Sequence, residues 1–453
     1  MKINEEIEVK IEKIADSGDG IARYDGLVIF VENACPNDIL KVKITKLNKN
    51  WASAKILEII TPSKFRIEPF CPLQKVCGAC QLQFIDYDYQ LKIKKQIVQD
   101  AVQKIGNLDV EVRDVIKSPE IKSYRHKVQY PVSQTKVSKR ILAGYYKQKS
   151  HEVVNIKYCP VQPKICDEII EYIRNKAFDY AISGFNEKKH SGDLRHIILR
   201  VSKATGKILV VLVVNSTKTF DRLNDFAKSI YDNFKEIDGV CVNFNSKKTN
   251  VILGNKSENL AGKSYITEKI LDKTFKIGVG SFFQINPMTA QNIFEYVKNY
   301  IKNNFDNPVV MDAYAGISTF GIIVSDVSKK VVSVEENKEA VELAGETAEF
   351  NGVKNLEIHN MDTQVFFDKE SRKYDVVILD PPRKGCTKET LDSVLKITKG
   401  SLIYVSCNPA TLARDLKYLC EKGAKVKFIQ PFDMFCHTVH VESVAIVDIN
   451  ALS

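Results

Sequence analysis

The chain has 453 residues, a formal net charge of +10, and 44% hydrophobic and 27% charged residues. This length predicts two or three domains, and the composition is typical of a globular protein rather than a disordered or fibrous one. No run of 18 or more apolar residues occurs, which argues against a membrane protein. The first residues lack the pattern of an export signal, so we expect a cytoplasmic protein whose 11 cysteines are reduced and act as ligands or catalysts.

The positive charge is concentrated in one part of the chain. Residues 90–203 contain 23 lysines and arginines but only 12 acids, an excess of 11 positive charges that accounts for the whole imbalance. A basic segment in an otherwise balanced chain indicates a polyanionic partner, above all a nucleic acid. Solvated lysines in a generally lysine-rich protein explain this feature equally well when it is taken alone.

The first 60 residues are predicted to form a small β-barrel of the OB type, because they contain about five short strands separated by turns. The clearest of these strands cover residues 6–12, 27–31, 39–44 and 52–60. Several lysines between residues 41 and 49 precede Trp51, and a basic strand with a nearby aromatic side chain fits contact with RNA. A plain barrel with lysines on its surface is the alternative.

Three cysteines lie within ten residues, with the spacing C-x5-C-x2-C at Cys71, Cys77 and Cys80. Such spacing requires a metal ion or a cluster, and the fourth ligand is best supplied by Cys159, which precedes a proline. Four thiolates fit either a [4Fe–4S] cluster or a structural zinc ion. Gly78 and Ala79 permit a tight loop around an object larger than one ion.

The segment from 110 to 270 is predicted to mix helices and strands. A basic helix covers residues 88–105, and the stretch 120–160 is rich in strands that carry arginine and tyrosine, such as Tyr124, Arg125 and Tyr130. Side chains of this kind on strands suit stacking on unpaired bases. The sequence alone does not define the order of the strands in this region.

From Tyr265 onwards strands and helices alternate, as in an open α/β sheet. A strand at 309–312 is followed by a small-residue turn containing Gly316 and Gly321, and a second strand ends at Glu335. An acid at this distance binds ribose hydroxyls in nucleotide-type sites. Because the glycine fingerprint for pyrophosphate is incomplete, the pattern favours S-adenosylmethionine, with Asp362 near the adenine edge.

Two further strands end in residues that carry chemistry. The strand at 374–379 ends in Asp380-Pro381-Pro382-Arg383, and the strand at 402–405 ends in Ser406-Cys407-Asn408-Pro409 before a helix at 410–419. Since ligands bind outside the carboxyl ends of such strands, we expect one shared pocket. The helix N-terminus is expected to favour the thiolate of Cys407. Glu442, inside an apolar strand at 439–447, must be paired or functional, a satisfied structural role being the alternative.

The combination of these motifs resembles the RNA uracil-5 methyltransferase family over essentially the whole chain. The resemblance is carried by Ser281-Phe282-Phe283-Gln284, Asp312-Ala313-Tyr314-Ala315-Gly316, Asp380-Pro381-Pro382-Arg383-Lys384-Gly385, Ser406-Cys407-Asn408-Pro409 and Val441-Glu442. The N-terminal barrel is similar to a TRAM domain, and the four cysteines resemble the [4Fe–4S] ligands of the ribosomal RNA branch. Two positions depart from the family's pattern: Ala315, where many members have cysteine, and Ser318, where many have a second turn glycine.

The resemblance implies an architecture of three domains. These are a TRAM-like RNA-binding barrel at 1–62, a central α/β domain at 63–270 with the iron–sulfur cysteines and a basic RNA-binding face, and a Rossmann-like S-adenosylmethionine-dependent methyltransferase domain at 271–453. Cys407 is implied as the nucleophile and Glu442 as the base. The implied cofactor-binding residues are Gln284, Tyr314, Glu335, Asp362 and Asp380.

The implied reaction is methylation of carbon 5 of a uridine in 23S ribosomal RNA by a monomeric enzyme without an obligate protein partner. Carbon 5 of uracil is a poor nucleophile, and addition of a thiolate to carbon 6 makes it a good one. A carboxylate then removes the proton on carbon 5 so that the cysteine can leave. The same reaction on transfer RNA is one alternative, and a non-catalytic iron–sulfur RNA-binding protein is another, although it predicts loss of Cys407 or Glu442.

Overall fold

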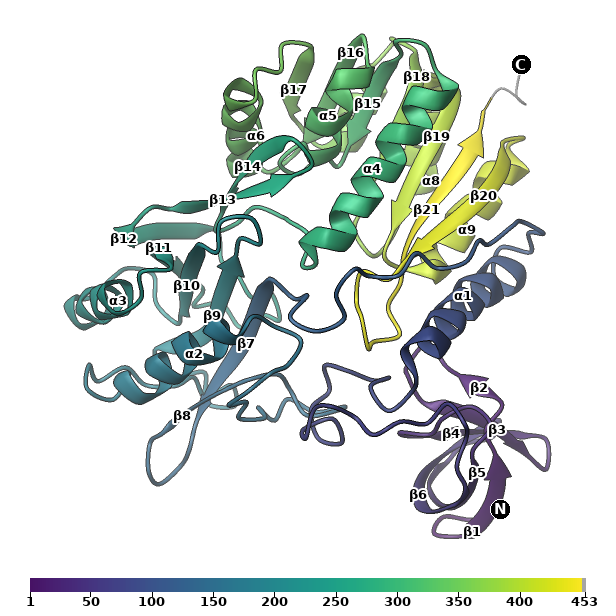
Figure 1. Ribbon diagram of the computed structural model, residues 1–453, viewed down its shortest axis with the longest axis vertical. Helices are drawn as coiled ribbons and strands as arrows, with labels where there is room; N and C mark the ends of the chain where they lie inside the picture. The colour runs from purple at the N-terminus through teal and green to yellow at the C-terminus, as the bar shows by residue number, and fades with distance from the viewer. Residues whose placement is uncertain (450–453) are drawn as a thin grey trace.

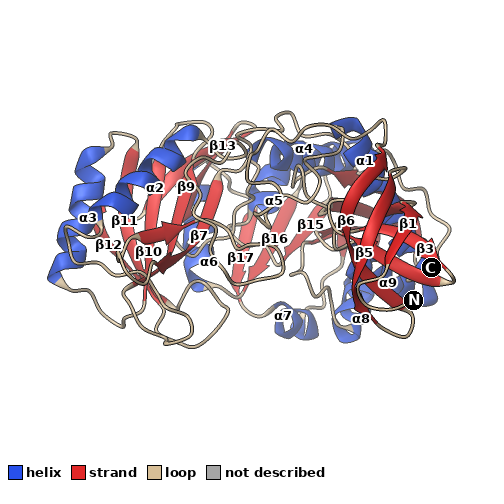
Figure 2. Cartoon of the chain, turned by 90° about the horizontal axis from the view of Figure 1, so that it is seen from below, coloured by secondary structure: helices blue, strands red, loops and turns tan. Residues whose placement is uncertain are grey.

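The computed structural model describes residues 1–449 and contains three large sheets in succession along the chain (Figure 1). The N-terminal barrel and the central sheet lie on different sides of the molecule in both views, and Figure 2 shows strands β15, β16 and β17 of the C-terminal sheet between them. The predicted α/β architecture with an N-terminal barrel is confirmed. No helix in the described part of the chain combines the length and the apolar character needed to cross a lipid bilayer.

The N-terminal sheet has six strands in the order β1-β5-β6-β4-β3-β2, one more than expected. Apolar side chains alternate along the strands and fill the interior of the barrel. One lysine of the basic strand is paired on the barrel surface, because the Lys41 ammonium lies 2.8 Å from the Glu6 carboxylate, and Lys46 lies over the Trp51 ring. The strands are β1 (Glu6–Lys10), β2 (Lys13–Ile14), β3 (Gly20–Tyr24), β4 (Leu27–Val31), β5 (Ile39–Leu47) and β6 (Trp51–Thr61).

The central sheet has the order β12-β11-β10-β9-β7-β8, and α2 and α3 cover one of its faces. Tyr124 and Tyr130 are buried in the core beneath these helices, so the expectation that they stack on bases is wrong. The elements are α1 (Tyr87–Lys104), β7 (Lys127–Gln134), β8 (Ile141–Ala143), α2 (Lys164–Lys176), β9 (Leu194–Val201), β10 (Ile208–Val214), α3 (Asp221–Asn233), β11 (Ile237–Phe244) and β12 (Lys256–Gly262).

The C-terminal region starts with a β-hairpin that packs on the other face of the central sheet. Its elements are β13 (Tyr265–Ile270), β14 (Lys273–Gly278), α4 (Pro287–Asn304), β15 (Val309–Ala313), α5 (Thr319–Val324), a short 3-10 helix (Ser325–Val327), β16 (Lys330–Glu335), α6 (Lys338–Phe350), β17 (Leu356–Asn360), α7 (Thr363–Lys369), β18 (Tyr374–Leu379), α8 (Lys388–Ile397), β19 (Thr398–Ser406), α9 (Pro409–Glu421), β20 (Lys425–Phe432) and β21 (Glu442–Asp448).

The seven-stranded sheet has the order β17-β16-β15-β18-β19-β21-β20. Strands β15 to β19 run parallel, and the strand order reverses between β15 and β18, where an open α/β sheet forms its ligand crevice. β21 is antiparallel to both of its neighbours. Its first residue therefore lies at the same edge of the sheet as the carboxyl ends of the parallel strands.

An N-terminal segment packs directly on this C-terminal sheet. Helix α1 contacts α9, and its residues Val98, Ala101 and Val102 belong to the core on that side of the sheet (Figure 1). Downstream of α1, Val112 and Ile116 form parallel bridges to residues of β20. The chain that follows the barrel therefore first packs on the seven-stranded sheet and only then forms the central sheet.

Candidate active site

One cavity of about 830 Å³ opens at the carboxyl edge of the seven-stranded sheet. It is the place where the structure brings together every candidate catalytic and cofactor residue named from the sequence. The residues from that set that line the cavity are Gln284, Tyr314, Glu335, Asp362, Asp380, Cys407 and Glu442. The shared edge of the parallel strands accounts for this convergence.

The cofactor side of the cavity is built on the turn after β15. The Glu335 carboxylate, at the end of β16, accepts hydrogen bonds from the backbone N–H of Gly316 and of Asn337, each at 2.8 Å. Asp362 caps helix α7 and accepts the backbone N–H of Val365 at 3.0 Å. These bonds fix both carboxylates at the rim of the turn, where hydroxyl and amino groups of a nucleoside can reach their remaining lone pairs.

Ser318, which departs from the family's pattern, does not obstruct this turn. It adopts a left-handed conformation with φ of 55°, and its side chain is buried. Its hydroxyl lies 2.6 Å from the Ser333 hydroxyl, inside the domain. Gly321 must remain a glycine, because an added Cβ would lie 2.4 Å from the Ser318 hydroxyl. The serine therefore serves the packing of the turn and leaves the cavity open.

The opposite side of the cavity holds the thiol and two carboxyl groups. Cys407 follows β19 directly, and Ser406 pairs with Ser443, so Cys407 and Glu442 come from neighbouring strand ends. Asn408 caps helix α9 through the backbone N–H of Ala410, and its amide donates to the Arg383 carbonyl at 3.1 Å. This contact ties the loop after β18 to the loop of the thiol.

The expectation that the helix N-terminus gives Cys407 a thiolate is wrong for the free protein. Burial and then the Glu442 carboxyl raise the pKa of the Cys407 thiol, Arg383 opposes them, and the net result is a pKa of about 11. The field of the helix N-terminus acts only over the first turn, and desolvation of the sulfur outweighs it. Arg383 is therefore the side chain that favours ionisation of the thiol.

Burial disfavours the ionised form of two carboxyl groups in the cavity. Burial raises the pKa of Asp380 to about 7. Burial also raises the pKa of Glu442 well above its usual range, with the Asp380 carboxyl as the second cause and Arg383 opposing. Two carboxyl groups in one buried site cannot both ionise easily, and such a pair provides an acid and a base side by side.

Aromatic and cationic side chains surround the mouth of the cavity. Phe282 is 60% exposed, and Phe435 packs edge-on against His440 with ring centroids 6.0 Å apart. The Arg383 guanidinium lies 3.4 Å from Nδ1 of His440. Burial and then Arg383 lower the pKa of His440 to about 4, so this ring is neutral. Flat rings beside a cation fit an unpaired base with its phosphate.

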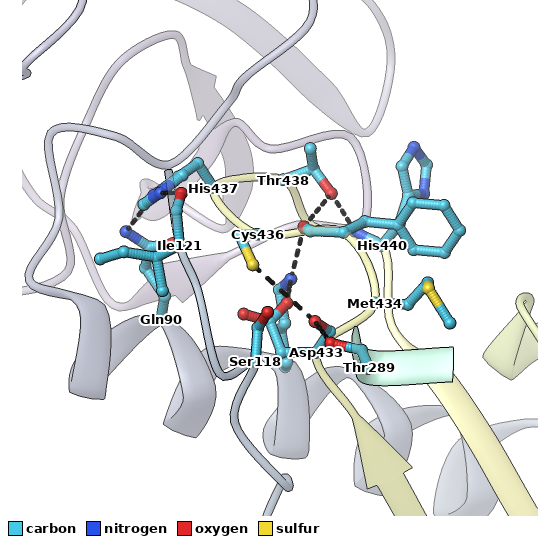
Figure 3. A network of polar contacts seen from close by, with 12 residues as sticks. Gln90, Ser118, Ile121, Thr289, Asp433, Met434, Cys436, His437, Thr438 and His440 are labelled. Carbon is cyan, nitrogen blue, oxygen red and sulfur yellow. Dashed lines mark hydrogen bonds and ion pairs between the residues drawn. The ribbon is translucent and has the colours of Figure 1, made fainter. Parts of the chain in front are cut away.

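The loop between β20 and β21, residues 433–441, carries Phe435 and His440 and leads into Glu442. Figure 3 shows Asp433, His437 and His440 of this loop. The His437 carbonyl accepts a hydrogen bond from the backbone N–H of Leu82 at 2.9 Å, and Nε2 of the His437 ring lies 2.8 Å from the Ile121 carbonyl oxygen. Asp433 accepts the Tyr87 hydroxyl at 2.7 Å and forms a buried ion pair with Lys94. Segments from the N-terminal third of the chain therefore fix this loop.

The sequence gives no indication of the ion pair between Lys94 and Asp433, because a lysine in a basic helix is normally exposed. Replacing Lys94 with alanine should lower the free energy of unfolding by about 3–5 kcal/mol, because it leaves a buried carboxylate without its partner. Chemical denaturation measures this loss. Lys95→Ala is the matched control, since its partner Asp114 is exposed and the pair contributes less than about 1 kcal/mol. Equal losses for the two variants would contradict the structural role of Lys94.

A second, small cavity is lined by the four cysteines named from the sequence, which are Cys71, Cys77, Cys80 and Cys159. Burial raises the pKa of each thiol. Arg125 is near enough to oppose this rise at Cys77, Cys80 and Cys159. Within residues 1–449, no three His, Cys, Asp or Glu side chains are spaced to hold a single metal ion.

Comparison with known proteins agrees with this geometry. The tRNA (uracil-5-)-methyltransferase family matches residues 86–449, and the TRAM domain matches residues 2–57. An uncharacterized RNA methyltransferase of Oceanobacillus iheyensis is 36% identical over 447 residues, covering 98% of this chain and 96% of the relative. An uncharacterized RNA methyltransferase of Clostridium tetani is 37% identical over 450 residues, covering 99% of this chain and 97% of the relative.

A solved structure matches the whole chain. The tRNA (uracil-54, C5)-methyltransferase of Pyrococcus abyssi, in complex with S-adenosyl-L-homocysteine, is 28% identical, with a TM-score of 0.76, and the match covers 97% of this chain and 100% of that one. The fold and the cavity define a methyltransferase of the S-adenosylmethionine-dependent class that acts on RNA. The chain belongs to the RNA (uracil-5-)-methyltransferase family and carries its TRAM domain.

Proposed function

We propose that this enzyme methylates carbon 5 of a uridine in 23S ribosomal RNA, with Cys407 as the nucleophile and Glu442 as the base. The observation that carries the assignment of roles is the single cavity lined by both side chains and by the five candidate cofactor residues. When bound, S-adenosylmethionine supplies an electrophilic methyl group. Glu335 and Asp362 hold its ribose and adenine, and Gln284, Tyr314 and Asp380 orient it towards the thiol side.

The residues of the chain carry the remaining steps. Cys407 gives up its thiol proton to solvent, and its sulfur then forms a bond to carbon 6 of uracil, which places the electron pair of the double bond at carbon 5. Carbon 5 would take the methyl group as the bond between that group and the sulfonium sulfur breaks, leaving S-adenosylhomocysteine, and the ionised Glu442 then removes the proton on carbon 5. The electrons of the broken C–H bond re-form the double bond as the bond from carbon 6 to sulfur breaks. Arg383, next to the thiol, stabilises the negative charge on sulfur at the start and the end of the cycle.

Transfer RNA is the second candidate substrate, because the Pyrococcus abyssi enzyme named above acts on tRNA and matches this chain along its full length. The resemblance of the cysteine spacing to the ribosomal RNA branch favours 23S RNA. Mass mapping of 5-methyluridine in both RNAs, from a strain that lacks the gene, decides between them. A missing methyl group in 23S RNA supports the proposal, and a missing methyl group only in tRNA overturns it.

We also propose that Cys71, Cys77, Cys80 and Cys159 hold a [4Fe–4S] cluster. The donor set fits, because four cysteines face one cavity and a cluster separates its ligands more widely than a single ion does. Arg125 supports an anionic group there, since its Nε is buried without a hydrogen-bond partner among the described residues. The cluster joins the 71–80 loop to the central domain and supplies no step of methyl transfer.

Protein purified without oxygen is expected to carry about four irons per chain and to absorb near 400 nm, as iron–sulfur proteins do. Replacing Cys77 with alanine should remove most of the iron and the absorption, because it takes away one ligand. Cys166→Ala is the matched control, since Cys166 is buried on α2 but does not line the cavity. One zinc ion per chain without colour would assign the four cysteines to a structural zinc site instead.

A further inference from the structure

Three positively charged side chains lie between the central sheet and the loop that leads to the active-site cavity. Lys127, the first residue of β7, stands directly opposite Arg200 of β9 in an antiparallel pair. Residues opposite each other in such a pair project from the same face. Arg125, two residues earlier, is close enough to Lys127 to influence its ionisation. Across residues 1–449, none of the three forms an ion pair with an acid, although the charge of Glu339 influences Arg200.

This arrangement is unfavourable in the free protein. Like charges directly opposite each other destabilise a pair of strands, and buried charges without partners cost more. Arg200 is satisfied in part, because its guanidinium donates to the carbonyls of Val279 and Ser281 at 2.9 and 2.6 Å. Arg125 is close enough to Cys80 and Cys159 for their charges to influence it. The Lys127 side chain has no hydrogen bond within the described residues, and burial, then Arg200 and Arg125, lower its pKa to about 7.

The position of Lys127 relates the cluster to the active site. Val128 and Tyr130 point into the core under α2 and α3, so Lys127 points to the other face of the sheet. That face meets the loop that Arg200 holds, which continues into Phe282 and Gln284 at the cavity. The backbone N–H of His126 donates to the Ile285 carbonyl at 2.7 Å and keeps the start of β7 against this loop. Lys127 is half-buried, and burial of its side chain disfavours a charge that no acid balances.

We propose that Lys127, supported by Arg200, binds a phosphodiester group of the substrate RNA next to the target uridine. This inference rests on the proposed function and adds a residue that holds the RNA strand. A phosphate supplies the negative charge that Lys127 and Arg200 lack, and lysine binds it as a point charge. The carboxylate of the cofactor is the other anion at hand, but Lys127 does not line the cavity in which the cofactor binds.

The test uses the full-length protein and the RNA fragment that the mass mapping identifies. Lys127→Gln should weaken RNA binding by roughly tenfold and reduce the slope of log Kd against log salt by about one, as loss of one phosphate contact does. Lys127→Arg should restore most of the affinity and the slope. Fragments with one uncharged methylphosphonate at each position near the uridine locate the contact, because one of them should bind wild type and Lys127→Gln equally.

Lys228→Gln is the matched control, since Lys228 lies exposed on α3, which covers the opposite face of the central sheet. The proposal is wrong if Lys127→Gln weakens RNA binding no more than this control, if no single methylphosphonate removes its effect, or if it weakens S-adenosylmethionine binding instead. Without RNA, Lys127→Gln should also melt at a higher temperature than wild type, because it removes the repulsion between Lys127 and Arg200. A large loss of stability in this variant would contradict the interpretation that the charge of Lys127 is unpaired. Failure of the proposed function is seen separately, as wild-type protein that binds the fragment but forms no 5-methyluridine.

Discussion

Cys407→Ala is expected to abolish methyl transfer while the protein remains folded. If the Cys407 sulfur forms the bond to carbon 6, its loss leaves carbon 5 as an unactivated nucleophile, and the rate of methyl incorporation should fall by at least about 10⁴-fold, as when other enzymes lose a nucleophile. The thiol lines an open cavity, so its removal creates no closed void in the core. Incorporation of labelled methyl groups into RNA under single-turnover conditions measures the effect.

The control for this variant is Cys420→Ala, since Cys420 lies near the other end of α9 and does not line the cavity. It should retain full activity. Both variants should keep the wild-type affinity for S-adenosylmethionine and the wild-type melting temperature within a few degrees. Turnover by Cys407→Ala at a rate near that of Cys420→Ala would exclude covalent catalysis through this residue.

Glu442→Gln is expected to trap a covalent complex between the enzyme and its RNA. The amide replaces the carboxyl group without a change of shape, so addition of Cys407 and methylation of carbon 5 can still occur. The proton on carbon 5 then has no base, and elimination of the cysteine should slow by about 10²–10⁴-fold. A denaturing gel should show a band shifted by the mass of the RNA, and overall turnover should fall by the same factor.

The double variant Cys407→Ala, Glu442→Gln provides the control, because it cannot form the bond to carbon 6 and should give no shifted band. Glu442→Gln should also be at least as stable as wild type, since it removes a buried acid that lies beside Asp380. A Glu442→Gln protein that binds RNA and cofactor but neither turns over nor gives an adduct would assign Glu442 to an earlier step.

The cavity was predictable from the sequence because its residues follow strands. Asp380 and Cys407 each come after a short apolar run, and parallel strands place such positions at one edge. Glu442 was placed inside a strand, whereas it is the first residue of β21. Periodicity does not give the direction of a strand, and only the antiparallel course of β21 explains why its start lies beside Cys407.

Other parts of the structure depend on contacts that the sequence does not record. Tyr124 and Tyr130 are residues of the kind found on RNA-binding strands. The alternation of side chains along a strand does not show which face of the sheet helices cover, and here α2 and α3 bury both tyrosines. Lys94 belongs to a basic helix, and its burial results from Asp433, which lies 339 residues further along the chain. Lys127 and Arg200 became neighbours only through the pairing of β7 with β9.

The distance in sequence between Lys94 and Asp433 also constrains how the protein is made. A ribosome releases the barrel, α1 and the central sheet long before the loop at 433–441, so nascent chains expose the lysine and the faces that this loop covers. Strand β21 inserts between β19 and β20 and can pair with neither until residues 442–448 have been made. The cavity at the edge of the seven-stranded sheet is therefore completed only after β21 has formed, and a chain that stops before Glu442 holds the barrel and the central sheet without a complete cavity.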